Sequence, residues 1–151
     1  MQGLIEREET IFYPDPSRII ARFLFTNNER ASKTIRSVME MSEEDVSVTL
    51  KQTLRDYSMR HRNISKIFEK HFRKIAYLIP PMNMDPDSID DSRRMLIGSY
   101  FTLEYSIESA AFFNPSIIEH PDQREIGPGQ LRVILSFRAT GEGHISSIVF
   151  R

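Results

Sequence analysis

The sequence predicts an α+β fold, in which a mainly helical N-terminal region is followed by a short antiparallel β-sheet. Three observations support this prediction. Apolar residues recur every three or four positions through the middle of the chain, prolines and glycines gather after Phe113, and apolar and polar residues then alternate. We therefore expect a helical region with an extended leading segment over residues 1–112 and strands over residues 113–151.

The leading segment is predicted to be extended chain. Residues 11–13 (IFY) favour strands, and residues 14–17 (PDPS) carry two prolines that a helix interior does not tolerate. The pattern indicates an extended piece, a turn, and a second extended or irregular piece that ends near Phe25.

The first two helices are predicted from their caps and apolar faces. The first begins at about Asn28, with Asn27 or Asn28 as its cap, and places four apolar residues on one face: Ala31, Ile35, Val38 and Met39. Ser42 is followed by three acidic residues, which is typical of a helix N-terminus. A second helix is therefore expected over about residues 43–58.

Two further helices are expected before the sheet. Asn63 is the predicted cap of the third, which continues to Ile79 and stops at the Pro80-Pro81 pair. The segment from Ile89 to Phe113 is the most apolar of the chain, and its apolar residues would cover more than half of a helical circumference. We expect it to form one long helix enclosed by its neighbours.

The last third of the chain has the pattern of strands. A short strand is predicted at Ile117-Ile118, a loop rich in proline and glycine over residues 120–130, a strand from Leu131 to Ala139, and a final strand over residues 144–151 after a Gly141-Glu142-Gly143 turn. The final strand is apolar, so we expect its edge to be covered by the helices, by a second copy, or by the rest of a larger β structure.

The composition excludes several classes of site. Twenty basic and twenty-one acidic residues give a formal charge of -1, so no global positive field is present to hold nucleic acid or an anionic membrane. Cysteine is absent and only four histidines occur, which disfavours a metal site. No stretch has the length and apolar character of a membrane span. We expect a cytoplasmic protein with no nucleic-acid or membrane partner and no metal.

Several segments of the chain resemble one known family. Residues 113–117 (FNPSI), 135–139 (LSFRA) and 141–151 (GEGHISSIVFR) resemble the opening of the catalytic domain of glycoside hydrolase family 130, the β-mannoside hydrolases and phosphorylases. Residues 14–23 (PDPSRIIARF), 98–108 (GSYFTLEYSIE) and 60–62 (RHR) resemble the helical preamble of its longer members. These short motifs occur in the family's order and together span nearly the whole chain.

The resemblance implies a five-bladed β-propeller with a sugar site at its centre. Because a four-stranded blade takes roughly 40 to 50 residues, the residues after Phe113 would form only the first strands of such a propeller. The family's catalytic carboxylates and the phosphate-binding residues of its phosphorylases would then lie outside this chain. We therefore expect no catalytic residue here, no cofactor, and inorganic phosphate as a co-substrate if the protein is a phosphorylase.

Four residues are candidates for binding a sugar: Asn114, Ser116, Arg138 and His144. By resemblance, Asn114 and Arg138 match positions that line the family's mannose site. Short polar groups and the planar guanidinium have the fixed donor geometry that sugar recognition needs. The alternatives are that Asn114 serves only a turn, that Arg138 is only solvated, and that His144 is structural.

Glu104 and Glu108 are the one carboxylate pair that would make this chain catalytic by itself. If both lie on the predicted long helix, their spacing of four residues places them on one face, about 6 Å apart. Carboxylate pairs at such separations perform acid and base catalysis on glycosides. The alternative, which we favour, is that they anchor the helix to the sheet.

Two functions follow from these observations. In the first, the chain is the N-terminal portion of an enzyme that resembles inverting β-mannoside hydrolases and phosphorylases, contributes part of the site for a mannose-containing oligosaccharide, and is inactive by itself. Its partner would be the remainder of the propeller or a second copy. In the second, the chain is a stand-alone α+β interaction module that dimerises through its open edge strand.

Overall fold

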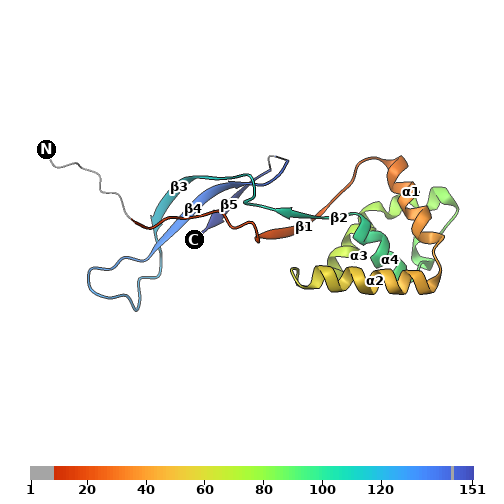
Figure 1. The fold of residues 1–151 in the computed structure, drawn as a ribbon, viewed down its shortest axis with the longest axis horizontal. Coiled ribbons are helices and arrows are strands. Elements are labelled where there is room, and N and C mark those ends of the chain that lie inside the picture. Colours follow the sequence, from red (N-terminus) through yellow and green to blue (C-terminus); the bar gives the residue numbers. More distant parts are fainter. Residues whose placement is uncertain (1–8, 144) are drawn as a thin grey trace. The chain divides into compact units, whose positions relative to one another are not determined.

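The computed structural model describes residues 9–143 and 145–151, and the fold is α+β as predicted. The chain divides into two compact units (Figure 1). The helical unit is Ile19–Tyr105, and the sheet unit combines the residues up to Arg18 with Ser106–Arg151. The sequence predicts a boundary after residue 112, whereas residues 106–112 belong to the sheet unit.

The helical unit is built around α4, which packs against α1, α2 and α3. Figure 1 labels its helices and strands. In chain order the elements are β1 (Ile19–Phe23), α1 (Asn28–Met39), α2 (Glu43–Ser58), α3 (Ile64–Ile75), three short 3₁₀ turns η1 (Ala76–Leu78), η2 (Pro80–Met82) and η3 (Pro86–Ser88), α4 (Asp91–Tyr100) and β2 (Thr102–Ser106). β1 pairs with β2 in a two-stranded sheet.

The predicted starts of the first two helices are confirmed. The Asn27 side chain accepts a hydrogen bond from the Arg30 amide at the start of α1, and the Ser42 hydroxyl accepts one from the Asp45 amide at the start of α2. Asn63 does precede α3, but its side chain makes no capping bond and its backbone is left-handed, with φ of 56°. The capping role predicted for Asn63 is therefore wrong.

The core of the helical unit lies between the faces that the apolar spacing predicted. Ile35 of α1, Phe68 and Ile75 of α3 and Leu96 and Ile97 of α4 are completely buried. α3 and α4 approach so closely that a Cβ atom on Gly98 would lie 1.9 Å from the Phe68 carbonyl oxygen. Only glycine fits at this crossing.

The single long helix predicted over Ile89–Phe113 is wrong. α4 ends at Tyr100, residues 102–106 form β2, and β3 begins at Ala111. Apolar residues all around a segment fit a buried strand as well as a buried helix, so periodicity alone does not separate them. Pairing of β2 with β1, far away in the sequence, decides for the strand.

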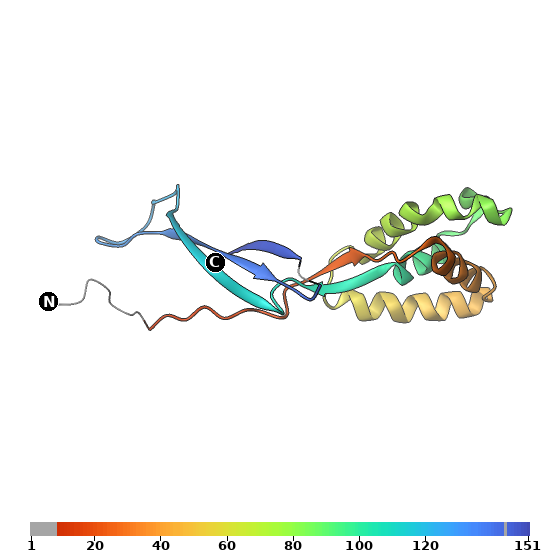
Figure 2. The same ribbon diagram turned by 90° about the horizontal axis from the view of Figure 1, so that it is seen from above.

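The sheet unit contains three antiparallel strands in the order β3-β4-β5. The strands are β3 (Ala111–Glu119), β4 (Val133–Thr140) and β5 (Ser146–Phe150), and they lie side by side in Figures 1 and 2. The alternation in the sequence therefore predicted this antiparallel sheet correctly, although β3 is longer than the two-residue strand expected at Ile117-Ile118.

The two faces of this sheet differ in burial. On one face Phe137, Ala139 and Val149 are buried, with Phe112 and Leu135 packed against them. Phe112 stacks on Phe137 with ring centroids 4.3 Å apart, and Phe12 of the leading segment lies 5.4 Å from Phe137. We call this the covered face. We call the opposite side the open face. It carries the residues that alternate with the buried ones along each strand: Phe113, Ser116, Ile118, Ile134, Ser136, Arg138, Ser146, Ile148 and Phe150.

Among the helices of the described residues, none has both the length and the apolar character required to cross a membrane.

Candidate functional site

The open face is interrupted by a bulge in β3 at Asn114. The register between β3 and β4 shifts between Phe113 and Ser116, and the Asn114 backbone has φ of 51°. Asparagine enters this left-handed region more readily than most residues. Bulges redirect side chains and are common beside binding sites. The backbone at Asn114, one of the predicted sugar-binding residues, therefore departs from that of a regular strand.

Arg138 lies directly across from this bulge. It pairs with Phe113 in the β3–β4 register, and its guanidinium carbon lies 5.5 Å from the centre of the Phe113 ring. Its Nε and Nη2 both donate to the Ser146 hydroxyl of β5, at 3.2 Å and 3.0 Å. Contacts on two neighbouring strands hold the exposed guanidinium in one orientation. Its remaining N–H groups have no hydrogen-bond acceptor among the described residues.

The neighbouring row of the open face places short hydroxyls beside an aromatic ring. Ser116 of β3 pairs with Ser136 of β4, which in turn pairs with Phe150 of β5. Phe150 is 61% exposed and Phe113 is 38% exposed. Aromatic surface next to fixed donors and acceptors suits a ligand that has both an apolar face and hydroxyl groups.

The structure brings three of the four predicted sugar-binding residues together. Asn114 and Ser116 flank Pro115 within the bulge, and Arg138 lies on the adjacent strand. His144 lies outside the described residues. Ser146 and Phe113 were not among the predicted site residues, although the alternation of β5 and the cross-strand pairing of an antiparallel sheet would have placed both on the face of Arg138.

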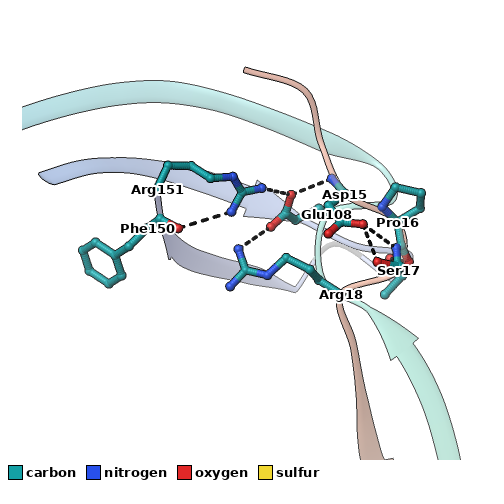
Figure 3. A network of polar contacts seen from close by, with 8 residues as sticks. Asp15, Pro16, Ser17, Arg18, Glu108, Phe150 and Arg151 are labelled. Carbon is teal, nitrogen blue, oxygen red and sulfur yellow. Dashed lines mark hydrogen bonds and ion pairs between the residues drawn. The ribbon is translucent and has the colours of Figure 1, made fainter. Parts of the chain in front are cut away.

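Glu108 lies in the turn between β2 and β3 and is buried in a network of donors (Figure 3). One carboxylate oxygen accepts from Arg18 at 2.8 Å. The other accepts from the Asp15 amide and from Arg151, each at 2.7 Å. These partners come from the leading segment and from the residue that follows β5. Glu108 therefore joins three separate parts of the sheet unit.

The electrostatic balance at Glu108 favours the carboxylate. Burial raises its pKa, but the Asp15 amide and the charges of Arg151 and Arg18 outweigh burial, so the pKa lies below its ordinary value. A general acid needs a raised pKa to hold its proton near neutral pH. Glu108 thus holds parts of the sheet unit together, and not a helix against the sheet as the sequence suggested.

Glu104 is held by a different set of partners, within the helical unit. The Arg60 guanidinium donates to both of its oxygens, at 2.9 Å and 3.0 Å, and His61 Nε2 lies 2.8 Å from one of them. The hydrogen bond from Arg60 lowers the pKa of Glu104. Because no helix contains Glu104 and Glu108, their predicted placement on one helical face is wrong, and each carboxylate is engaged by its own cations.

Within the described residues, no three His, Asp or Glu side chains gather in a way that would hold a metal ion.

Among known proteins, no family matches the chain, and no curated protein or solved structure is significantly similar to it. The assignment of the candidate site is therefore based on its geometry and on the motifs in the sequence.

Proposed function

We propose that the chain is a saccharide-binding portion of a protein related to the β-mannoside hydrolases and phosphorylases of glycoside hydrolase family 130. The ligand would be a mannose-containing oligosaccharide bound on the open face of the sheet. The observation that carries this proposal is the fixed guanidinium of Arg138, held by Ser146 and Phe113 across from the bulge at Asn114.

The chemistry of this face fits a sugar better than an ion. Arg138 supplies planar donors for hydroxyl oxygens, and Ser116 and Ser136 both donate and accept. The half-exposed ring of Phe113 offers apolar surface for the C–H face of a pyranose. In this proposal β3, β4 and β5 are the first strands of the propeller that the sequence motifs imply.

This portion would bind the sugar without cleaving it. The lowered pKa values of Glu104 and Glu108 make both carboxylates poor general acids. The general acid and base, and the groups that bind inorganic phosphate in a phosphorylase, would come from outside the chain. We expect no hydrolysis or phosphorolysis of mannobiosides by this chain alone.

Titration with mannobiose, followed by amide chemical shifts, tests the proposal. Shifts should be confined to β3–β5, and Arg138→Ala should weaken binding by about ten- to a hundredfold, because charged hydrogen bonds to the ligand are lost. Arg124→Ala is the matched control, since Arg124 lies in the exposed loop before β4 and pairs with Asp122. Absence of shifts at millimolar sugar, or equal weakening by both variants, would reject the proposal.

A second candidate is an interaction module that dimerises through β5. Within the described residues β5 pairs with β4 alone, and Ile148 and Phe150 are 64% and 61% exposed. An apolar edge strand of this kind offers unpaired backbone groups to another strand. Phe150→Lys should then convert a dimer into a monomer in sedimentation experiments at any salt concentration. A wild-type chain that stays monomeric would exclude this candidate.

A further inference from the structure

The exposed side of α3 carries a row of cations. Lys66, Lys70 and Lys74 recur every four residues, and Arg73 lies beside them. All four are exposed and, together with Glu69, line one surface groove. Residues four apart lie on the same side of a helix, so the three lysines span about 12 Å along one line. We call these three lysines the basic row.

Neither stability of the helix nor internal pairing accounts for the first two members of this row. Lys66 lies in the first turn of α3, where a cation opposes the helix dipole, and that turn has no acidic residue. Like charges four residues apart also repel. Glu69 pairs with Arg73, and in the described part of the chain neither Lys66 nor Lys70 has an ion-pair partner. Lys66 and Lys70 are therefore not explained by their own helix and suit an anionic partner.

The same unit presents a matching acidic surface where α2 and α4 begin. Glu43 and Asp90 line a common groove with Arg93, which pairs with Asp90 at 3.4 Å, and the exposed Glu44 and Asp91 lie next to it. Asp91 is 91% exposed and only loosely paired, 3.8 Å from Arg94. Glu43 and Glu44 make no ion pair within the described residues. We call these four residues the acidic end.

We propose that the basic row of one copy binds the acidic end of a second copy. Two features favour this occupant over nucleic acid. The isoelectric point of about 6.4 is far below that of typical nucleic-acid-binding domains, and the row is too short to follow a phosphate backbone. The number of charges on the acidic end, in contrast, is similar to the number on the basic row. Because the two surfaces differ, the contact is head-to-tail and leaves one surface free on each outer copy.

Sedimentation velocity of the full chain tests this contact. The wild-type chain should self-associate at low salt and dissociate at high salt, since exposed charges are screened beyond about 10 Å at 0.1 M. Lys66→Gln with Lys70→Gln, or Glu43→Gln with Glu44→Gln, should each weaken association about tenfold. Lys33→Gln with Lys51→Gln, two exposed lysines on α1 and α2, removes the same charge and should have no effect.

Mixing the two variants separates head-to-tail pairing from other arrangements. The lysine variant keeps its acidic end and the glutamate variant keeps its basic row, so an equimolar mixture should form complexes of two chains and no larger species. The proposal is overturned if the wild-type chain is monomeric at low salt, if association is insensitive to salt and to these substitutions, or if the basic row binds a polyanion such as heparin while the chain remains monomeric.

Discussion

Glu108 and Arg151, 43 residues apart in the sequence, form a 2.7 Å ion pair inside the sheet unit (Figure 3). The Arg151 guanidinium also lies 5.2 Å from the Phe112 ring on the covered face. Through Glu108 this arginine is connected to the Asp15 amide and to Arg18. The leading segment and the residue after β5 are thus fixed by one buried carboxylate.

Replacing Glu108 with Gln should lower the free energy of unfolding by about 2 to 3 kcal/mol. The amide cannot offer two charged acceptors to the arginines, and its NH₂ group would face the Asp15 amide or an arginine. Because Arg18 and Arg151 are partly exposed and can be hydrated, the loss stays below that of a fully buried pair. Urea unfolding of the full chain measures it.

Glu104→Gln is the comparison for that experiment. The Glu104 side chain is 28% exposed, and solvent weakens its pair with Arg60, so its loss should be clearly smaller than that of Glu108→Gln. Equal effects at both positions would contradict the central role assigned to Glu108.

Stability should fall in acid because of the same carboxylate. The pKa of Glu108 is lowered in the folded chain, so the unfolded chain takes up the proton first as the pH falls. The contribution is complete above the ordinary value of 4.5 and is lost as the pH falls below it, through the lower folded pKa. Unfolding free energies measured across this range should show a shallower acid slope for Glu108→Gln than for the wild type.

A second pH dependence is expected from His71. The Thr102 hydroxyl donates its one hydrogen to the Gly98 carbonyl, so its oxygen must accept from Nδ1 of His71, 2.7 Å away. Burial, and then Lys74 and Lys70, lower the pKa of His71. The unfolded chain therefore gains a proton first, and stability should decline as the pH falls below about 6.5.

His71→Gln should remove this decline while leaving the loss below pH 4.5 in place. The measurement is the slope of unfolding free energy against pH, and not its absolute value, which the substitution also changes. His120→Gln, in the sheet unit, is the control and should keep the slope because His71 is still present. If the slope persists in His71→Gln, the pH dependence of stability comes from another titratable group.

Gly98→Ala should destabilise the helical unit by about 1 to 3 kcal/mol or more, although alanine is intrinsically the better helix former. The added Cβ would overlap the Phe68 carbonyl oxygen, and both backbones would have to move apart. Ser99→Ala, the next position on α4, should change stability by less than half as much, since it removes only a hydroxyl that donates to the Leu96 carbonyl. Thermal unfolding of both variants compares them, and a neutral Gly98→Ala would contradict the close helix crossing.

Parts of the candidate site could be predicted from sequence because they depend on neighbours along the chain. The alternation around Arg138 places it on the face opposite that of the buried Phe137. The sequence places Asn114-Pro115 just after a helix, whereas the pair lies in a bulge within β3. The partners of Arg138 could not be predicted in this way. Ser146 and Phe113 contact it only because of the β3–β4–β5 register, which the bulge shifts.

α1, α2 and the alternating strand β4 follow from local sequence, because caps and apolar periodicity act over a few residues. The conformation of residues 101–111 and the partners of Glu104 and Glu108 depend instead on tertiary contacts. That segment is apolar enough for either a helix or a strand, and pairing with β1 settles it as a strand. The acceptors of Arg60, Arg18 and Arg151 lie 43 to 90 residues away, and local propensity carries no information about such contacts.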